Sequence, residues 1–401
     1  MRKSLMRIPY TELFPPPVTR PPTARSLPGA VTALHEFFTT PAPKGLTGST
    51  VVLSGAGLSV ASGLADYRGV NGTYRVNKTY RPIYYHEFLA SHEARKRYWA
   101  RSFLGWSTLQ KAQPNAGHQA VKDLGQLGLV SNVITQNVDS FHHKAHPEIP
   151  TLELHGYLRS AVCTSCWSEL PRQSFQDELA RLNPIWAAFL QEAIASGALD
   201  TEDPEEKRAR GIRMNPDGDV DVPDAPYTTF RYPACPKCLS HPPTLADGAE
   251  GVVEVDRDGA WSPTSTAGIL KPAVVMFGES ISAEVKRSAE EAIDGAGRVL
   301  VLATSLATYS AWRLAKRAKD RGMPIAIVNM GGVRGEDILA AELDPQQSGA
   351  QGVRVEMSTE SLLPTLVEEL RRSKPKGVDA MPAAAVLPFA SNTAVFKDML
   401  S

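Results

Sequence analysis

The sequence predicts an α/β protein with a doubly wound parallel sheet and a smaller second module. Five short runs rich in β-branched residues end in small or polar residues, as buried parallel strands do, at residues 51–54, 133–135, 274–277, 299–303 and 325–329. Helical patterns follow at about residues 117–127, 283–293, 309–321 and 361–372. Alternation of strands and helices favours a sheet with helices on both faces, which binds ligands at the carboxyl ends of its strands.

Two stretches interrupt this alternation and predict the smaller module. Residues 70–114 are rich in aromatic residues and arginine and predict a helical insertion. Residues 159–268 hold all four cysteines and a charged run at 200–210, which we interpret as a solvated loop. We expect an N-terminal extension over 1–48, a folded domain over 49–372 and a disordered tail over 373–401. Within that domain we expect the sheet to use residues 49–69, 115–158 and 269–372.

The overall composition indicates a globular protein and does not favour a highly charged partner such as nucleic acid. The chain has 401 residues, 42% of them hydrophobic, and 43 basic residues balance 43 acidic ones. This balance favours neither nucleic acid nor an anionic membrane as a partner. No run of about 18 apolar residues occurs, so a membrane-spanning helix is not predicted. We expect a monomer.

The N-terminal residues have the composition of a mitochondrial transit peptide. The first 30 residues contain hydroxylated side chains and a single acid, Glu12. Their basic residues are Arg2, Lys3, Arg7, Arg20 and Arg25. Three prolines at residues 15–17 limit an amphipathic helix to the first dozen residues, so a disordered basic tail is the alternative. We expect a location in the mitochondrial matrix, with the cytoplasm or nucleus as the alternative.

A glycine-rich loop follows the first predicted strand. It consists of Gly55, Ala56, Gly57, Leu58 and Ser59. Such a backbone can approach a phosphate group closely at the start of a helix, although a tight strand-to-helix turn would need the same residues. A dehydrogenase fingerprint is not met, because Val60 stands where its last glycine would be.

An acidic, an aromatic and a basic residue come next. Asp66, Tyr67 and Arg68 would place a carboxylate, a ring and a guanidinium beside a dinucleotide. An ion pair between Asp66 and Arg68 that only shapes the loop is the alternative. Leu64 lies in the same segment.

Polar side chains also end the strand predicted at 133–135. Gln136, Asn137 and Asp139 offer hydrogen-bond partners for ribose hydroxyls and a carboxamide, which is more than a strand cap needs. His155 follows in Leu154-His155-Gly156. An imidazole that titrates near neutrality is the usual proton acceptor for a hydroxyl, although a structural histidine is the alternative.

The four cysteines predict a structural zinc site. They form two pairs with metal-ligand spacing, Cys163-x2-Cys166 and Cys235-x2-Cys238. Two such pairs supply the four thiolates of a tetrahedral site, which has no open position for catalysis. Disulfides are the alternative, but nothing marks the chain as secreted.

The motifs in this order resemble those of the sirtuins, NAD-consuming protein deacylases with a Rossmann-like sheet and a zinc-binding module. After the cysteines come the segment 271–279 and two further motifs, Ala303-Thr304-Ser305-Leu306 and Asn329-Met330-Gly331. The resemblance runs from about residue 51 to 371 and is highly specific, because many motifs occur in a fixed order. Segments at 81–83, 97–101, 105–106, 182–186 and 306–310 are similar to the class II, mitochondrial sirtuin-four branch.

The resemblance implies a role for each motif. NAD would be the co-substrate and one Zn²⁺ would be structural, while His155 and Asn137 would be catalytic. The residues that would bind NAD are Gly55, Ala56, Gly57, Ser59, Leu64, Asp66, Tyr67, Arg68, Gln136, Asn137, Asp139, Ala303, Thr304, Ser305, Asn329, Met330 and Gly331. An acylated-lysine peptide would pair by β-augmentation with Val274, Val275, Met276, Phe277, Gly278 and Glu279.

Three positions depart from the family pattern. Ala65 stands where the family usually has proline, His146 replaces a glycine, and Ala273 replaces an aspartate. None of them removes the expected base or a zinc ligand, so they bear on efficiency and substrate choice.

The resemblance implies NAD-dependent deacylation of lysine. The acyl oxygen would attack C1′ of the ribose and expel nicotinamide, and His155 would take a proton from a ribose hydroxyl. The products would be lysine, nicotinamide and O-acyl-ADP-ribose. Two alternatives stay open, namely protein ADP-ribosylation on the same fold and a non-catalytic zinc module that binds nucleic acid or protein. Acetyl, lipoyl-like and branched acyl groups are all compatible with the motifs.

Overall fold

The computed structural model describes residue 8 and residues 10–78, 80–197, 213–222, 224–340, 343 and 349–373. They form two compact units. The first comprises residues up to 80, Gln113–Leu154 and residues from 281 onward, and the second comprises Arg81–Ala112 and His155–Ser280. The charged run at 200–210 lies outside the described residues, as do residues 1–7 and 9 of the expected extension and residues 374–401 of the expected tail.

The first unit contains a six-stranded parallel sheet with the strand order β11-β10-β9-β1-β2-β3. Its strands are β1 (Thr50–Ser54), β2 (Val130–Thr135), β3 (Thr151–Glu153), β9 (Arg298–Leu302), β10 (Ile325–Val328) and β11 (Gly352–Val355). Four of them match predicted strands. The sequence did not indicate β3 and β11, which are only three and four residues long.

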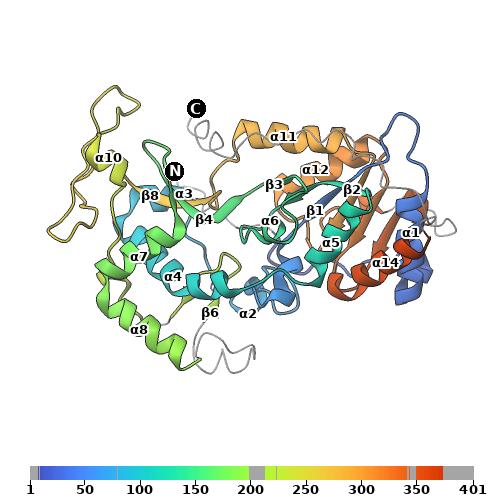
Figure 1. Cartoon of the computed structure of the whole chain (residues 1–401), viewed down its shortest axis with the longest axis horizontal. Helices are drawn as coiled ribbons and strands as arrows, with labels where there is room; N and C mark the ends of the chain where they lie inside the picture. Colours follow the sequence, from blue (N-terminus) through green and yellow to red (C-terminus); the bar gives the residue numbers. More distant parts are fainter. Residues whose placement is uncertain are drawn as a thin grey trace, which may run out of the picture. The chain divides into compact units, whose positions relative to one another are not determined.

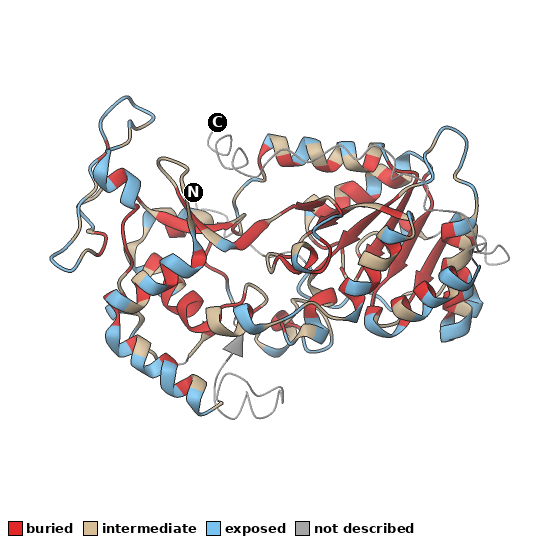
Figure 2. Ribbon diagram, viewed as in Figure 1, coloured by how far each residue is buried: buried red, intermediate tan, exposed pale blue. Residues whose placement is uncertain are grey.

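Helices cover both faces of this sheet (Figure 1). On one face α1 (Leu27–Thr39), α5 (Ala116–Gln126) and α14 (Thr359–Ser373) form a common core with the strands. On the other face lie α11 (Ala283–Asp294) and α12 (Tyr309–Asp320). Because both faces are covered, the central strands are buried along their length (Figure 2). The predicted doubly wound fold and its four helices are confirmed.

Short elements complete the first unit. They are η1 (Pro22–Arg25), η2 (Ala56–Ser62), α2 (Thr73–Val76), α6 (Phe141–Ala145), α13 (Glu336–Leu339) and η4 (Gly349–Gln351).

Helix α1 lies in the part of the chain that we expected to be an extension. Its side chains Ala30, Leu34 and Phe37 are fully buried and belong to the core of the first unit. Ser26 caps the helix by accepting a hydrogen bond from Gly29 N at 3.3 Å, and Pro28 stands in its first turn. The expected boundary at residue 49 therefore comes too late, because the core of this unit already includes α1.

Replacing Phe37 by alanine is expected to lower the free energy of unfolding of the first unit by about 3–5 kcal/mol, because it empties a fully buried position. Leu27→Ala is the matched control, since Leu27 starts the same helix and is 38% exposed. It should change the stability by less than about 0.5 kcal/mol. Urea denaturation followed by circular dichroism measures both, and equal stabilities would contradict the packing of α1.

The second unit is built on a three-stranded antiparallel sheet with the order β5-β4-β8. Its elements are α3 (Tyr85–Ala90), α4 (His92–Lys111), β4 (Gly156–Cys163), β5 (Glu169–Pro171), α7 (Arg172–Leu182), α8 (Pro184–Ala195), β6 (Arg213–Met214), β7 (Val220–Asp221), η3 (Tyr227–Thr229), α10 (Pro236–Ser240) and β8 (Leu270–Val274). Aromatic side chains such as Trp99, Phe175 and Phe230 fill its core. The predicted helical insertion corresponds to α2, α3 and α4, of which α3 and α4 belong to this unit.

The strand predicted at 274–277 is wrong in its position and its sheet. The observed strand, β8, ends at Val274 and pairs antiparallel with β4 in the second unit. Beyond it the chain turns, because Glu279 accepts a hydrogen bond from Met276 N at 2.8 Å and Gly278 has a φ of 83°. Apolar continuity alone does not distinguish this strand from those of the parallel sheet.

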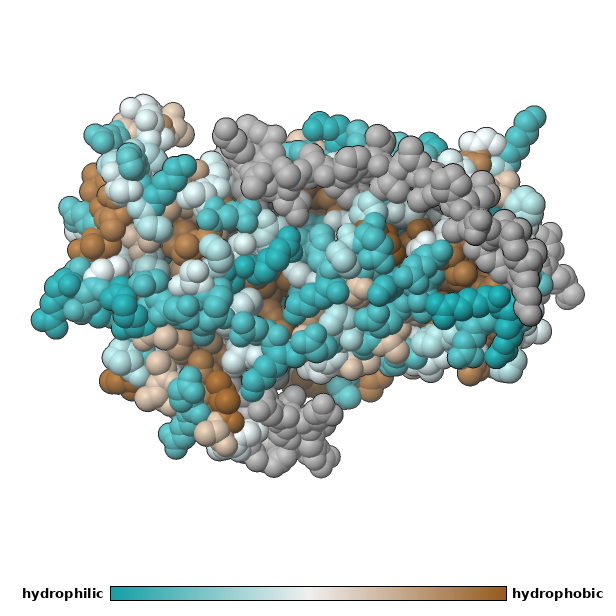
Figure 3. Space-filling view, viewed as in Figure 1, coloured by the Kyte–Doolittle hydropathy of each residue, from teal (hydrophilic) through white to brown (hydrophobic). Residues whose placement is uncertain are grey.

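The distribution of polar side chains over the surface agrees with the balanced numbers of basic and acidic residues. Hydrophilic side chains are spread over much of the face drawn in Figure 3. Among the described residues, no helix has both the length and the apolar character needed to span a membrane.

Candidate active site and metal centre

The first group of predicted site residues lies at the point in the sheet where the order of the strands reverses, between β1 and β9. Strand β1 pairs with β2 on one side and with β9 on the other, and the helices that follow β1 and β9 in the crossovers, α5 and α12, cover opposite faces of the sheet, which is the point where ligands bind in such folds. The loops after β1 and β9 are in direct contact, because Gly57 N donates to Ala303 O at 3.1 Å. A Cβ on Gly55 would collide with the Thr304 side chain, which explains the requirement for glycine there.

Gln136 connects this point to the strand beside it. Its Nε2 donates to Ser54 O at 3.1 Å and to Thr304 Oγ1 at 2.8 Å. Its Oε1 accepts from Thr308 Oγ1 at 3.0 Å. The glutamine side chain is therefore fixed by the loops that follow β1 and β9, and Thr308, which the sequence did not indicate, completes its environment.

Asn137 and Asp139 form a second network over the glycine-rich loop. Asn137 Nδ2 donates to Gly55 O and to Ser59 Oγ, each at 3.1 Å, and Ser59 Oγ donates to Asp139 Oδ2 at 2.6 Å. Burial raises the pKa of Asp139. Among the described residues, the buried Asn137 Oδ1 has no hydrogen-bond partner. A buried acceptor of this kind suits a ligand that brings a donor, such as a ribose hydroxyl or the carboxamide of NAD.

The segment that contains Asp66, Tyr67 and Arg68 packs locally. Asp66 Oδ1 accepts from Gly69 N at 3.1 Å, and burial raises the pKa of its carboxyl group. The Tyr67 and Tyr74 rings lie 5.4 Å apart, and the Arg68 guanidinium lies 5.0 Å from the Tyr74 ring.

The loop after β10 is held by an arginine that the sequence did not indicate. Asn329 Nδ2 donates to Met330 O at 3.1 Å and to Gly331 O at 3.0 Å. Arg354 on β11 is fully buried and donates to Gly331 O at 2.6 Å and to Asn329 O at 3.2 Å. It also forms an ion pair with Glu336 at 2.5 Å. The only sequence feature that could have indicated this role is the position of an arginine within the otherwise apolar run Val353–Val355.

His155 is the first residue of the second unit and follows Leu154, whose N donates to Thr135 O at 2.8 Å. The His155 carbonyl accepts a hydrogen bond from Val275 N at 2.8 Å, so the histidine backbone is tied to the segment predicted to bind the peptide. Gly156 has a φ of 74°, and a Cβ there would collide with Ala273 O. The glycine after the histidine is thus required by the pairing of β4 with β8.

The segment Val274 to Glu279 is already bonded at several backbone groups. Besides the bond at Val275 N, Phe277 O accepts from Tyr85 N at 2.9 Å and Val274 O accepts from Lys271 Nζ at 2.8 Å. Lys271 Nζ lies 3.3 Å from Glu279 Oε2, and both side chains are buried. This ion pair shapes the segment. A contact of Glu279 with the peptide therefore stays a prediction. The structure shows in addition that Glu279 positions the segment through its ion pair.

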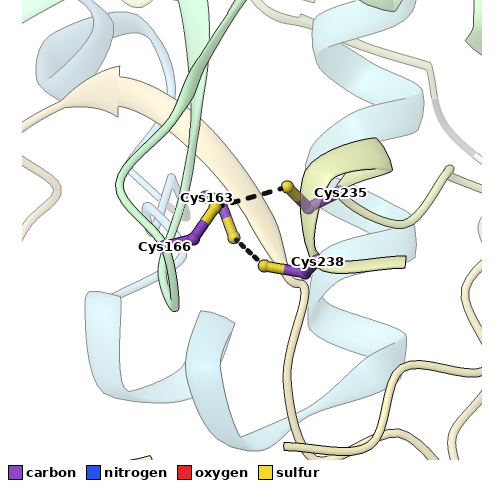
Figure 4. Close-up of side chains that lie close together, drawn as sticks. All are labelled: Cys163, Cys166, Cys235 and Cys238. Carbon is purple, nitrogen blue, oxygen red and sulfur yellow. Dashed lines mark hydrogen bonds between the residues drawn. The ribbon is translucent and has the colours of Figure 1, made fainter. Parts of the chain in front are cut away.

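The four cysteines come together in the second unit. Cys163 and Cys166 lie at the end of β4 and in the turn after it, while Cys235 and Cys238 lie at the start of α10 (Figure 4). All four Sγ atoms lie within 4.8 Å of one another. The Sγ atoms of Cys163 and Cys238 are 3.5 Å apart, and those of Cys166 and Cys235 are 3.7 Å apart.

These distances fit a tetrahedral zinc site. Metal–sulfur bonds of about 2.3 Å give sulfur–sulfur edges of about 3.8 Å in a tetrahedron. Burial raises the pKa of the Cys238 thiol, and four thiolates this close repel one another, so they would coexist only around a cation. Ser165 N lies 3.4 Å from Cys163 Sγ and Ser168 Oγ lies 2.9 Å from Cys166 Sγ, so both sulfur atoms have a nearby hydrogen-bond donor that would stabilise a metal-bound thiolate.

Comparison with known proteins identifies the family. The model of the Sir2 family matches residues 55–310, which is more than half of the chain. The chain belongs to the Sir2 family. A solved structure, "Structural Basis for the Mechanism and Regulation of Sir2 Enzymes", has the same fold, with a TM-score of 0.54 at 21% identity, and the alignment covers 86% of this chain and 98% of the other. The expected sirtuin resemblance and fold class are confirmed.

Relatives with assigned activities include an NAD-dependent protein deacylase, SIR4, of Batrachochytrium dendrobatidis. It is 40% identical over 299 residues, which cover 73% of this chain and 84% of the relative. The NAD-dependent protein deacylase SRT2 of Arabidopsis thaliana is 37% identical, over 73% of this chain and 69% of the relative. The mitochondrial NAD-dependent protein lipoamidase sirtuin-4 of Bos taurus is 31% identical, over 83% of this chain and 87% of the relative.

One departure from the sirtuin pattern, His146, ends a buried chain of hydrogen bonds. Ser54 Oγ donates to Thr135 Oγ1 at 2.9 Å, so the serine hydroxyl must accept from His142 Nε2 at 2.8 Å. His142 Nδ1 then accepts from His146 Nε2 at 2.8 Å, which assigns the proton to Nε2 in both neutral rings. At the other end, Thr135 Oγ1 accepts from Asn137 N at 3.1 Å. His146 is thereby connected to the loop that carries the predicted catalytic asparagine.

A third buried histidine, His118, lies beside this chain, with its ring 5.1 Å from that of His142. Burial lowers the pKa of His118 to about 3 and that of His146 to about 4, and it also lowers the pKa of His142. The three rings are therefore neutral in the folded sirtuin, whereas they bind protons near pH 6.5 in the unfolded chain. Their contribution to stability is complete above pH 6.5 and is lost as the pH falls toward the folded pKa values.

A His146→Gln variant should lose less stability in acid than the wild-type chain. At pH 5 the unfolded state gains about 2 kcal/mol from protonating one such histidine, and the variant removes that gain. The free energy of unfolding, measured in urea at pH 7.5 and pH 5.0, gives the comparison. Equal losses in the two proteins would contradict a neutral, buried His146.

Proposed function

We propose that this chain is an NAD-dependent protein lysine deacylase that releases nicotinamide and O-acyl-ADP-ribose. Membership in the Sir2 family supports this reaction, as do the assigned activities of the relatives in Batrachochytrium dendrobatidis and Arabidopsis thaliana. The observation that carries the proposal is the network around Asn137, where a buried acceptor remains at the junction of the glycine-rich loop and β2.

In this proposal the first unit binds and orients NAD. The backbone N–H groups of the glycine-rich loop take the phosphates, and Gly55 and Gly57 allow this loop to pack closely against Ala303 and Thr304. Asn137 Oδ1 and the Asp139 carboxyl group receive donors from the ribose and the carboxamide. Gln136 ties the loop after β9 to the end of β1 through Thr304 and Ser54. Bound NAD supplies an electrophilic ribose carbon from which nicotinamide can leave.

The second unit would supply the base and the peptide site. His155 would act as the base that accepts the proton of a ribose hydroxyl when NAD is bound. The hydrogen bond between the His155 carbonyl and Val275 N links the base to the peptide segment. Four thiolates around Zn²⁺ would hold β4 and α10 together and leave no open position for catalysis.

We further propose that the chain acts as a monomer on acylated-lysine proteins in the mitochondrial matrix, without a nucleic-acid or membrane partner. The relative in Bos taurus, a mitochondrial lipoamidase, supports the location and suggests that longer acyl groups be tested beside acetyl.

A panel of acyl-lysine peptides tests the proposed function. Acetyl, lipoyl and branched-chain acyl peptides are incubated with NAD, and the products are identified by mass spectrometry. We expect at least one peptide to yield free lysine together with O-acyl-ADP-ribose. ADP-ribose attached to protein, with no acyl transfer from any peptide, would instead indicate an ADP-ribosyltransferase and contradict the proposal.

A further inference from the structure

Residues 10–20, which precede α1, lie against loops that hold predicted NAD residues. This N-terminal segment comes before the part of the chain that matches the Sir2 family model, residues 55–310. We propose that the N-terminal segment is a structural part of the NAD site in this chain and that its removal weakens NAD binding without unfolding the first unit. The inference rests on the proposed function and concerns the same site.

The first contact involves the loop of Asp66, Tyr67 and Arg68. Arg68 Nε donates a hydrogen bond to the carbonyl oxygen of Tyr10 at 2.8 Å. Tyr10 has a φ of 57°, a conformation that an aromatic residue keeps only when its surroundings hold it. The ring of Phe14 stacks on that of Tyr10, with the centroids 5.3 Å apart and the planes inclined by 29°.

The second contact involves the loop that follows β10. The Arg334 guanidinium lies 5.1 Å from the Tyr10 ring and 5.3 Å from the Trp312 ring. Arg334 N donates to Ser305 O at 2.9 Å, so the same residue reaches the loop after β9. Gly332 packs directly against the N-terminal segment, because a Cβ there would collide with Phe14.

The third contact fixes the far end of the segment. Arg20 N donates to Arg354 O at 3.0 Å, and Arg354 N donates to Arg20 O at 2.8 Å. The side chain of Arg354 binds the carbonyl oxygens of Asn329 and Gly331. The segment therefore extends β11 at its edge and connects, through one arginine, to the asparagine motif.

The N-terminal segment contacts positively charged side chains whose charge suits a dinucleotide. Tyr10 contacts two guanidinium groups, one from each of two separate loops, namely those of Arg68 and Arg334. Guanidinium groups form charge-assisted hydrogen bonds with phosphate oxygens, so these two arginines are suited to the diphosphate of NAD. Tyr10 holds both loops before the ligand arrives, and such preorganisation increases affinity by lowering the cost of ordering them on binding.

The test compares the full chain with a variant that lacks residues 2–18 but keeps Arg20 and α1. Isothermal titration with NAD gives the dissociation constant, thermal unfolding gives the stability, and steady-state kinetics give separate KM values for NAD and peptide. We expect the dissociation constant and the KM for NAD to rise about tenfold, while the peptide KM and the melting temperature stay close to those of the full chain.

Phe14→Ala is a second variant, in case the deletion perturbs folding, with Leu27→Ala as the surface control outside the segment. We expect Phe14→Ala to weaken NAD binding about threefold and Leu27→Ala to leave it unchanged. Unchanged NAD affinity in the deletion variant would overturn the inference, and so would tighter binding, which would mean that the segment obstructs the site. The proposed function fails separately, if the full chain binds NAD but forms no O-acyl-ADP-ribose.

Discussion

A His155→Ala variant is expected to deacylate peptide about 10²- to 10⁴-fold more slowly than the wild-type chain while binding NAD with unchanged affinity. The residues proposed to bind NAD, such as Gln136 and Asn137, are held by hydrogen bonds to the loops after β1 and β9, so removing the imidazole should leave them in place. The backbone bond from Val275 N to the His155 carbonyl does not depend on the side chain, so the local fold should persist.

Single-turnover kinetics and NAD titration separate the two effects. His241→Ala is a suitable control, because His241 is exposed at the end of α10. It should retain wild-type turnover. Full activity of His155→Ala would contradict the role of His155 as the base, and loss of NAD binding would assign the residue to the cofactor site instead.

Loss of one zinc ligand is expected to unfold the second unit at 37 °C. In Cys238→Ser three thiols remain, of which Cys163 and Cys235 are buried, but the zinc loses one of its four sulfur ligands. Structural zinc sites contribute on the order of 10 kcal/mol to folding, which is comparable with the whole stability of a typical domain. Elemental analysis should find one zinc per wild-type chain and much less in the variant, and calorimetry should show the unfolding of the second unit only in the wild-type chain.

Chelation and reduction distinguish zinc from disulfides. A strong chelator should destabilise the wild-type chain, and added zinc should restore it, whereas a reducing agent alone should have little effect. Ser240→Ala is the control on α10, because it leaves the four thiols in place. A metal-free wild-type chain with an unchanged melting temperature would contradict the structural zinc site.

The sequence predicted the parts of the site that depend on local patterns. The two cysteine pairs have ligand spacing, and the structure brings their Sγ atoms within 4.8 Å. Strands β1, β9 and β10 are continuous apolar runs because both of their faces are buried. Such features follow from residue spacing and need no knowledge of the remaining chain.

Other parts depend on contacts between distant residues. Gln136 pairs with Thr304 although 168 positions separate them, and no local pattern reveals that pairing. The sequence did not indicate helix α1, because the residues around it are basic and contain prolines. The role of this helix depends on packing against α14 and β11. Strand β8 has the same apolar pattern as a parallel strand, and only its partner β4 decides its sheet.

The stoichiometry of the reaction tests the central claim most directly. Purified wild-type chain is given an acyl-lysine peptide with and without NAD, and nicotinamide and deacylated peptide are quantified over the same time course. The proposed function predicts one nicotinamide for each deacylated lysine and no deacylation without NAD. Deacylation without NAD, or nicotinamide release that is not matched by acyl loss, would contradict it.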